Sequence, residues 1–93
     1  MRIVSLLQTT GFSPCQWEGL LDDGRSIYIR YRGGRLSAGI GRDIEDAVDG
    51  LIAGREPFYM ERIGEKYDGR IMEDMMLVFI EQWLSGLTEC RDE

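Results

Sequence analysis

Five arginines fall between positions 25 and 42 with no acidic residue among them, in a chain whose net charge is −6. They are Arg25, Arg30, Arg32, Arg35 and Arg42. The rest of the chain carries all 17 acidic residues against six of the 11 basic ones, so the charge is strongly segregated. A surface of one sign focuses the electric field and selects partners, whereas net charge alone mainly sets solubility. The arginine run is therefore a candidate binding surface for an anionic ligand.

The acidic residues do not form a catalytic pattern. Three pairs are adjacent in sequence, namely Asp22-Asp23, Glu45-Asp46 and Glu73-Asp74. Sequence neighbours point apart on a strand and do not share a helix face, so no pair holds two carboxylates across a substrate. Histidine is absent, which removes the commonest general base and metal ligand together. We therefore expect no enzyme activity, no metal and no cofactor.

Two further motifs have simple structural interpretations. Gly39-Ile40-Gly41 precedes a predicted helix, but it lacks the third glycine of a nucleotide fingerprint, and Asp43 would repel a phosphate. Cys15 and Cys90 are the only cysteines. We interpret them as two free thiols in a reducing cytosol, with a disulfide between them as the alternative.

The composition also limits the location and the partners. The longest apolar stretch, from Met75 to Ile80, is six residues long, whereas a membrane span needs about 20. We expect a cytoplasmic protein without a membrane segment. A pI near 4.6 argues against general DNA binding, because phosphate contacts need an excess of positive charge.

The elements that position the arginines are two predicted hairpins. Asp23-Gly24 and Gly33-Gly34 have the residue types of two-residue type I′ turns. Two-residue loops set the register, and they predict a three-stranded meander over residues 16–41. Its buried face would hold Leu20, Ile27, Ile29, Tyr31, Leu36, Ala38 and Ile40, with Glu18 on the same side.

The opposite face of the predicted meander carries Trp17, Tyr28, Arg30, Arg32, Arg35 and Ser37. In this register Trp17 lies opposite Arg30 and can stack on it, and Tyr28 lies between Gly19 and Gly39. Two interpretations remain open. The aromatic rings and arginine stems shield an outer sheet face, or the face is a contact patch, since Arg, Tyr and Trp dominate interface hot spots.

Helical spacing predicts the remaining elements. Asp43 is an N-cap and Gly54 a C-terminal cap of one helix, and a longer helix runs over residues 71–86 with an inner stripe of Met72, Met76, Phe79, Ile80, Trp83 and Leu87. A short strand near 58–63 follows Pro57, which confines it to a sheet edge. Residues 3–10 fit a short helix, with a strand as the alternative.

These elements predict one α+β domain over residues 1–93, in the order α-β-β-β-α-β-α. The antiparallel sheet would have three to four strands, with the helices packed on one face.

The leading functional hypothesis is a non-enzymatic binding module that occludes a basic partner. Small acidic domains without active-site residues are typical of inhibitors of nucleic-acid machinery, such as phage anti-defence proteins of the anti-CRISPR type, and of toxin-immunity proteins; this is an analogy of class. The acidic surface would consist of helix residues, Glu45, Asp46, Asp49, Glu73, Asp74 and Glu81.

Two alternatives use other surfaces. The sheet face with Trp17, Tyr28, Arg30, Arg32 and Arg35 would bind single-stranded nucleic acid or an acidic peptide. The acidic remainder of the chain disfavours the nucleic acid. The third hypothesis is a homodimer joined through the helix at 71–86, whose methionines suit adaptable contacts.

Overall fold

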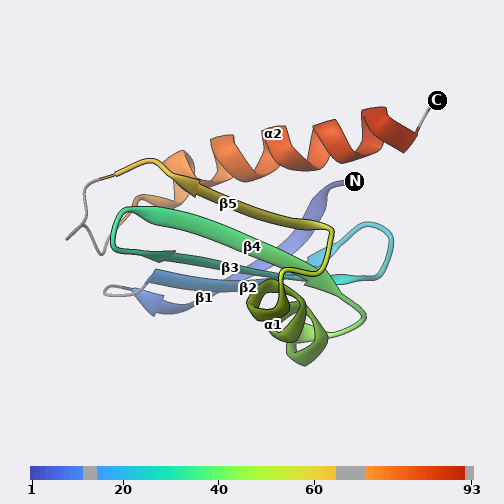
Figure 1. Ribbon diagram of the computed structural model, residues 1–93, viewed down its shortest axis with the longest axis horizontal. Coiled ribbons are helices and arrows are strands. Elements are labelled where there is room, and N and C mark those ends of the chain that lie inside the picture. The colour runs from blue at the N-terminus through green and yellow to red at the C-terminus, as the bar shows by residue number, and fades with distance from the viewer. Residues whose placement is uncertain (12–14, 65–70, 92–93) are drawn as a thin grey trace.

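The computed structural model describes residues 1–11, 15–64 and 71–91, and these form five strands and two helices. The elements are β1 (Ile3–Gly11), β2 (Cys15–Leu21), β3 (Ser26–Arg32), β4 (Arg35–Gly41), α1 (Ile44–Ala53), β5 (Phe58–Arg62) and α2 (Glu73–Arg91). The strands form one antiparallel sheet in the order β1-β2-β3-β4-β5 (Figure 1). The α+β class and the antiparallel sheet are confirmed, whereas the count of three to four strands is too low.

The prediction of a helix at the N-terminus is wrong, because residues 3–11 form an edge strand with two irregularities. The register of β1 against β2 shifts between Ile3 and Ser5 and again between Gln8 and Thr10. A bulge inserts one residue into a strand, so side chains three positions apart point to the same side. Ile3 and Leu6 accordingly both pack against the core. Their spacing imitates that of a helix.

The second hairpin has the predicted register. Gly33 and Gly34 both have positive φ, 60° and 78°, as the type I′ turn requires. Tyr31 pairs with Leu36 and Ile27 pairs with Ile40, so the apolar residues of both strands share one face.

The first hairpin has a different turn from the predicted one. The amide of Leu21 donates to the carbonyl of Arg25 at 2.8 Å, which leaves three residues in the loop, and Gly24 has φ of 89°. This is the pattern of a three-residue hairpin loop that ends in a left-handed glycine. One additional loop residue moves the register by one, and a shift of one reverses the facing of every side chain in β2.

The shifted register corrects four predictions for β2. Leu20 is 47% exposed instead of buried, and Leu21 takes its place in the core. Trp17 pairs with Ile29 instead of Arg30 and is fully buried. Glu18, predicted on the core side, pairs with Tyr28 on the other face, so Tyr28 lies between Glu18 and Gly39 instead of between two glycines.

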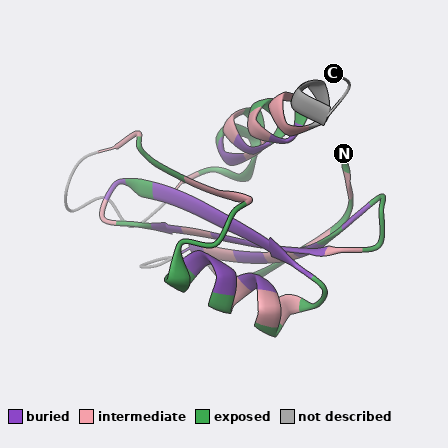
Figure 2. Cartoon of the chain, turned by 45° about the vertical axis from the view of Figure 1, so that its right-hand side comes forward, coloured by how far each residue is buried: buried purple, intermediate pink, exposed green. Residues whose placement is uncertain are grey.

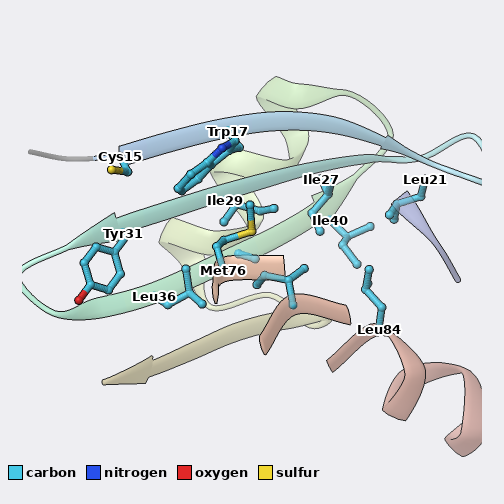
Figure 3. Close-up of a cluster of buried hydrophobic side chains, with 12 residues drawn as sticks. Cys15, Trp17, Leu21, Ile27, Ile29, Tyr31, Leu36, Ile40, Met76 and Leu84 are labelled. Carbon is cyan, nitrogen blue, oxygen red and sulfur yellow. The ribbon is translucent and has the colours of Figure 1, made fainter. Parts of the chain in front are cut away.

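The two helices lie on opposite faces of the sheet, so the prediction that they share one face is wrong (Figure 1). We call the face under α2 the inner face and the face under α1 the outer face. The inner face and α2 form the main core, which contains Cys15, Trp17, Leu21, Ile27, Ile29, Tyr31, Leu36, Ala38, Ile40, Met76, Ile80 and Leu84 (Figure 3). A smaller cluster joins α1 to the outer face at Tyr28, Ala47 and Leu51.

Helix α1 lies close to the sheet because two glycines of β4 face it. A Cβ atom on Gly41 would lie 2.5 Å from the amide nitrogen of Ala47, and one on Gly39 would meet the carbonyl oxygen of the same residue. Both predicted caps are confirmed: Asp43 accepts a hydrogen bond from the amide of Asp46, and Gly54 has φ of 71°. Gly39-Ile40-Gly41 is therefore the seat of α1.

Helix α2 buries a narrower stripe than predicted. Met76, Ile80 and Leu84, which recur at every fourth residue, are at most 1% exposed. Phe79, Trp83 and Leu87 pack only partly against them. Met72, expected on the inner stripe, is 72% exposed, because it precedes the helix. As Pro57 predicted, β5 lies at an edge of the sheet.

Candidate anion-binding site

The outer face of the sheet is covered by α1 at one end only. Figure 2 shows α1 against the buried surface of the strands at that end. Beyond it, the outer face forms a hollow of about 250 Å³, lined by Arg30, Arg32, Arg35, Ser37 and Met60. We call this the arginine hollow.

Strand pairing brings these side chains together from three strands. Ser37 of β4 pairs with Arg30 of β3 and with Met60 of β5, which places the three in one row across the sheet. In the next row, Arg35 pairs with Arg32 on one side and with Arg62 on the other. We call Arg32, Arg35 and Arg62 the arginine row.

The arginine row places like charges directly opposite each other on adjacent strands, an arrangement that destabilises a sheet. Described acids do not compensate these charges: the ion pairs found in the described ranges join Arg25 to Asp23, and Arg42 and Arg55 to Asp46. Arg62 donates instead to the carbonyl of Gly33 at 3.1 Å. This end of the outer face is therefore a concentrated positive surface.

Arg30 adds a second unusual feature to the hollow. Its Nε is buried and has no hydrogen-bond partner. Buried polar groups are nearly always hydrogen-bonded, and an unsatisfied donor costs about 1–3 kcal/mol. An anion in the hollow would supply acceptor oxygens to this arginine and charge compensation to the row.

The two aromatic residues predicted on this face are not available for binding. Trp17 points into the inner core, where its Nε1 donates to Oε1 of Glu73 at 3.0 Å, so the predicted stack on Arg30 is wrong. Tyr28 does lie on the outer face, but α1 covers it and leaves 9% exposed. Burial raises the pKa of Tyr28 although the Arg30 guanidinium lowers it, so Tyr28 is a neutral phenol at neutral pH.

The six acids predicted as one binding surface are divided between the two faces of the molecule. Glu45, Asp46 and Asp49 belong to α1, and Glu73, Asp74 and Glu81 belong to α2. Two of them have internal partners, since Glu73 accepts from Trp17 and Asp46 forms ion pairs with Arg55 and Arg42. The acids therefore do not form one continuous surface.

Asp46 predicts a measurable effect of pH. The backbone hydrogen bond from Arg42, with a smaller contribution from the Arg55 side chain, lowers the pKa of Asp46 below its ordinary value of 3.8. A lowered folded-state pKa stabilises the fold above the ordinary value, and this stabilisation is lost as pH falls through the lowered pKa. Asp46→Asn should therefore melt below the wild type at neutral pH, and the two melting temperatures should converge near pH about 2.

Thermal melts followed by circular dichroism over this pH range would measure the difference. Glu45→Gln is the matched control, because Glu45 is exposed and neighbours Asp46 in α1. A difference between Asp46→Asn and wild type that stays constant with pH would contradict the role of the carboxylate.

We found no match to this chain among protein-family models, curated proteins or solved structures. The function therefore has to be argued from the site itself. In the part of the chain that the structure describes, no three side chains are grouped so as to hold a metal ion. Neither described helix is long and apolar enough to cross a membrane.

Part of the candidate site was foreseeable and part was missed. Arg30, Arg32 and Arg35 lie together on one face, as the register of the second hairpin predicts. Met60 and Arg62 were missed, although Met60 alternates with Tyr59 and Glu61 in the predicted edge strand. Pairing of that strand with β4 would have added both residues to the arginine face. Cys15 is a buried thiol in β2, and Cys90 lies outside the described side chains.

Proposed function

We propose that this protein is a non-enzymatic binding module that holds an acidic segment of a partner protein in the arginine hollow. The observation that carries the proposal is the arginine row, in which three guanidinium groups face the same side of adjacent strands without an acid among the described residues to pair with them. Guanidinium groups bind carboxylates through charge-assisted, often bidentate hydrogen bonds, so an acidic segment supplies what this surface lacks.

The chemistry of the hollow favours a protein ligand over single-stranded nucleic acid. Proteins that bind single strands combine positive charge with exposed aromatic rings on which bases stack. Here Trp17 is in the core and Tyr28 is beneath α1, so neither presents a ring. Met60 is 50% exposed at the hollow, and its flexible thioether suits the aliphatic part of a peptide side chain.

The hypothesis of an acidic surface that occludes a basic partner remains a prediction, and so does a cytoplasmic location. Because its six residues lie on two helices at opposite faces of the sheet, a partner would contact one helix at a time. The arginine hollow is instead one continuous site, which is why we rank it first.

Binding of a short fluorescein-labelled oligoglutamate peptide, followed by fluorescence anisotropy, tests the proposal. We expect binding that weakens with added salt. The double variant Arg32→Ala/Arg35→Ala removes two exposed guanidinium groups from the hollow, and we expect it to bind at least about tenfold more weakly.

The double variant Arg25→Ala/Arg42→Ala is the matched control, because it changes the net charge equally at two positions outside the hollow. Equal weakening in both double variants would mean that net charge alone attracts the peptide, and the proposal would fail. A labelled oligothymidine that binds more tightly than the peptide, with the same dependence on Arg32 and Arg35, would replace the protein ligand with nucleic acid.

A further inference from the structure

We infer that the group recognised in the arginine hollow is a phosphate monoester on the partner segment, that is, a phosphorylated serine or threonine side chain. The inference rests on the proposed function and adds the chemical identity of the anion. Its basis is the number, the arrangement and the lack of partners of the donors around one hollow.

The first argument is charge. The arginine row and Arg30 bring four guanidinium groups to one end of the outer face, and no ion pair found within the described ranges involves them. The one acid of β2, Glu18, lies opposite Tyr28 in a row further toward α1. A carboxylate brings a single negative charge, whereas a phosphate monoester brings about 1.5 to 2 near neutral pH. The dianion therefore compensates this surface better.

The second argument is the direction of the donors. Arg30 and Ser37 lie in one row of the sheet, and Arg32 and Arg35 lie in the next, so the donors approach the hollow from two rows and two strands. A planar carboxylate is satisfied by a single guanidinium fork. A phosphate monoester has three terminal acceptor oxygens in a tetrahedral arrangement, and it can bind several such donors at once.

The third argument is the Nε of Arg30, which is buried and has no hydrogen-bond partner. This donor belongs to the residue that lines the hollow nearest the centre of β3. Ser37 makes only a long bond, 3.4 Å from its Oγ to the carbonyl of Arg30, so its hydroxyl is easily redirected to a ligand. The volume of about 250 Å³ is several times the share of one water, about 30 Å³, and accommodates a phosphoryl group with its ordered solvent.

Three versions of one acidic peptide, with serine, glutamate or phosphoserine at the central position, would test the inference by fluorescence anisotropy. We expect the phosphoserine peptide to bind at least tenfold more tightly than the glutamate peptide. Arg30→Lys keeps the charge but removes the guanidinium, and we expect it to abolish most of this preference. Arg25→Ala, which lies in the first hairpin outside the hollow, should retain it.

The outcomes separate this inference from the proposed function. If the glutamate and phosphoserine peptides bind equally and both depend on Arg32 and Arg35, the inference fails and the proposed function stands. If no peptide binds, both fail. A preference for phosphoserine that survives in Arg30→Lys and in Arg32→Ala/Arg35→Ala would place the phosphate elsewhere and overturn the inference.

Inorganic phosphate distinguishes a free anion from one carried by a protein. We expect it to displace the phosphoserine peptide only at a concentration far above the dissociation constant of the peptide, because the peptide adds contacts of its own. Equal affinity for inorganic phosphate would make the free anion the ligand and overturn the assignment to a partner segment. Should Arg30→Lys fold poorly, the exposed pair Arg32→Ala/Arg35→Ala provides the same comparison.

Discussion

Replacing Met76 with alanine should lower the free energy of unfolding by about 2–5 kcal/mol, the range for deleting a large apolar side chain from a packed core. Met76 is fully buried on the side of α2 that faces the sheet. It lies in the main core with Ile29 and Leu36, so its removal leaves a cavity between the helix and two strands (Figure 3). Urea unfolding followed by circular dichroism would measure the loss.

Met75→Ala is the matched control for this experiment. It removes the same atoms from the preceding position of α2, where the side chain is 55% exposed. We expect a change within about 0.5 kcal/mol, as for most surface substitutions. Equal losses in the two variants would show that α2 does not present Met76 to the sheet.

The second hairpin and the limits of α1 were predictable because local residues determine them. Gly33-Gly34 supplies two consecutive residues with positive φ, and only one turn type uses both. Asp43 and Gly54 cap α1 through their own side chain or backbone conformation. In each case the residues that set the structure lie within a few positions of it.

The first hairpin was mispredicted because Asp-Gly is compatible with two loop lengths. Gly24 has the positive φ that either turn would require, so the turn sequence alone does not decide the register. The strand itself contained the answer: Cys15, Trp17 and Leu21 alternate with Gln16 and Glu18. Burial of Trp17, the largest of these side chains, outweighs the preference of a turn, and the predicted register had placed Glu18 on the core side.

The arginine hollow depends on contacts that are distant in sequence. The arginines of β3 and β4 share a face through a local turn, but Arg62 joins them only because β5 returns to pair with β4 after α1. The position of α1 on the outer face decides which half of that face stays open. Sequence periodicity gives each helix an apolar side, but it does not say which face of the sheet that side covers.

The seat of α1 provides the second prediction of large effect. Gly39→Ala should lower the free energy of unfolding by about 3 kcal/mol, the upper end of the usual cost of overpacking. The new Cβ would lie 2.9 Å from the Cβ of Leu51 and against the carbonyl oxygen of Ala47. Backbone atoms of a helix do not yield as a flexible side chain does, so α1 has to move away from β4. Urea unfolding would measure the loss, and hydrogen exchange would locate it in α1.

Gly86→Ala is the control for this substitution, because a Cβ at Gly86 meets no atom within 4 Å. Gly86 lies inside α2, where alanine is favoured over glycine by about 0.5–1 kcal/mol, so this variant should be slightly more stable than the wild type. A Gly39→Ala variant as stable as the wild type would mean that α1 does not rest on β4. Since the arginine hollow begins where α1 ends, Gly39→Ala should loosen α1 and expose Tyr28 while β3 and β4 keep their pairing. Binding of an acidic peptide that disappears in Gly39→Ala, with the sheet intact, would place the contact on α1 and not among the arginines.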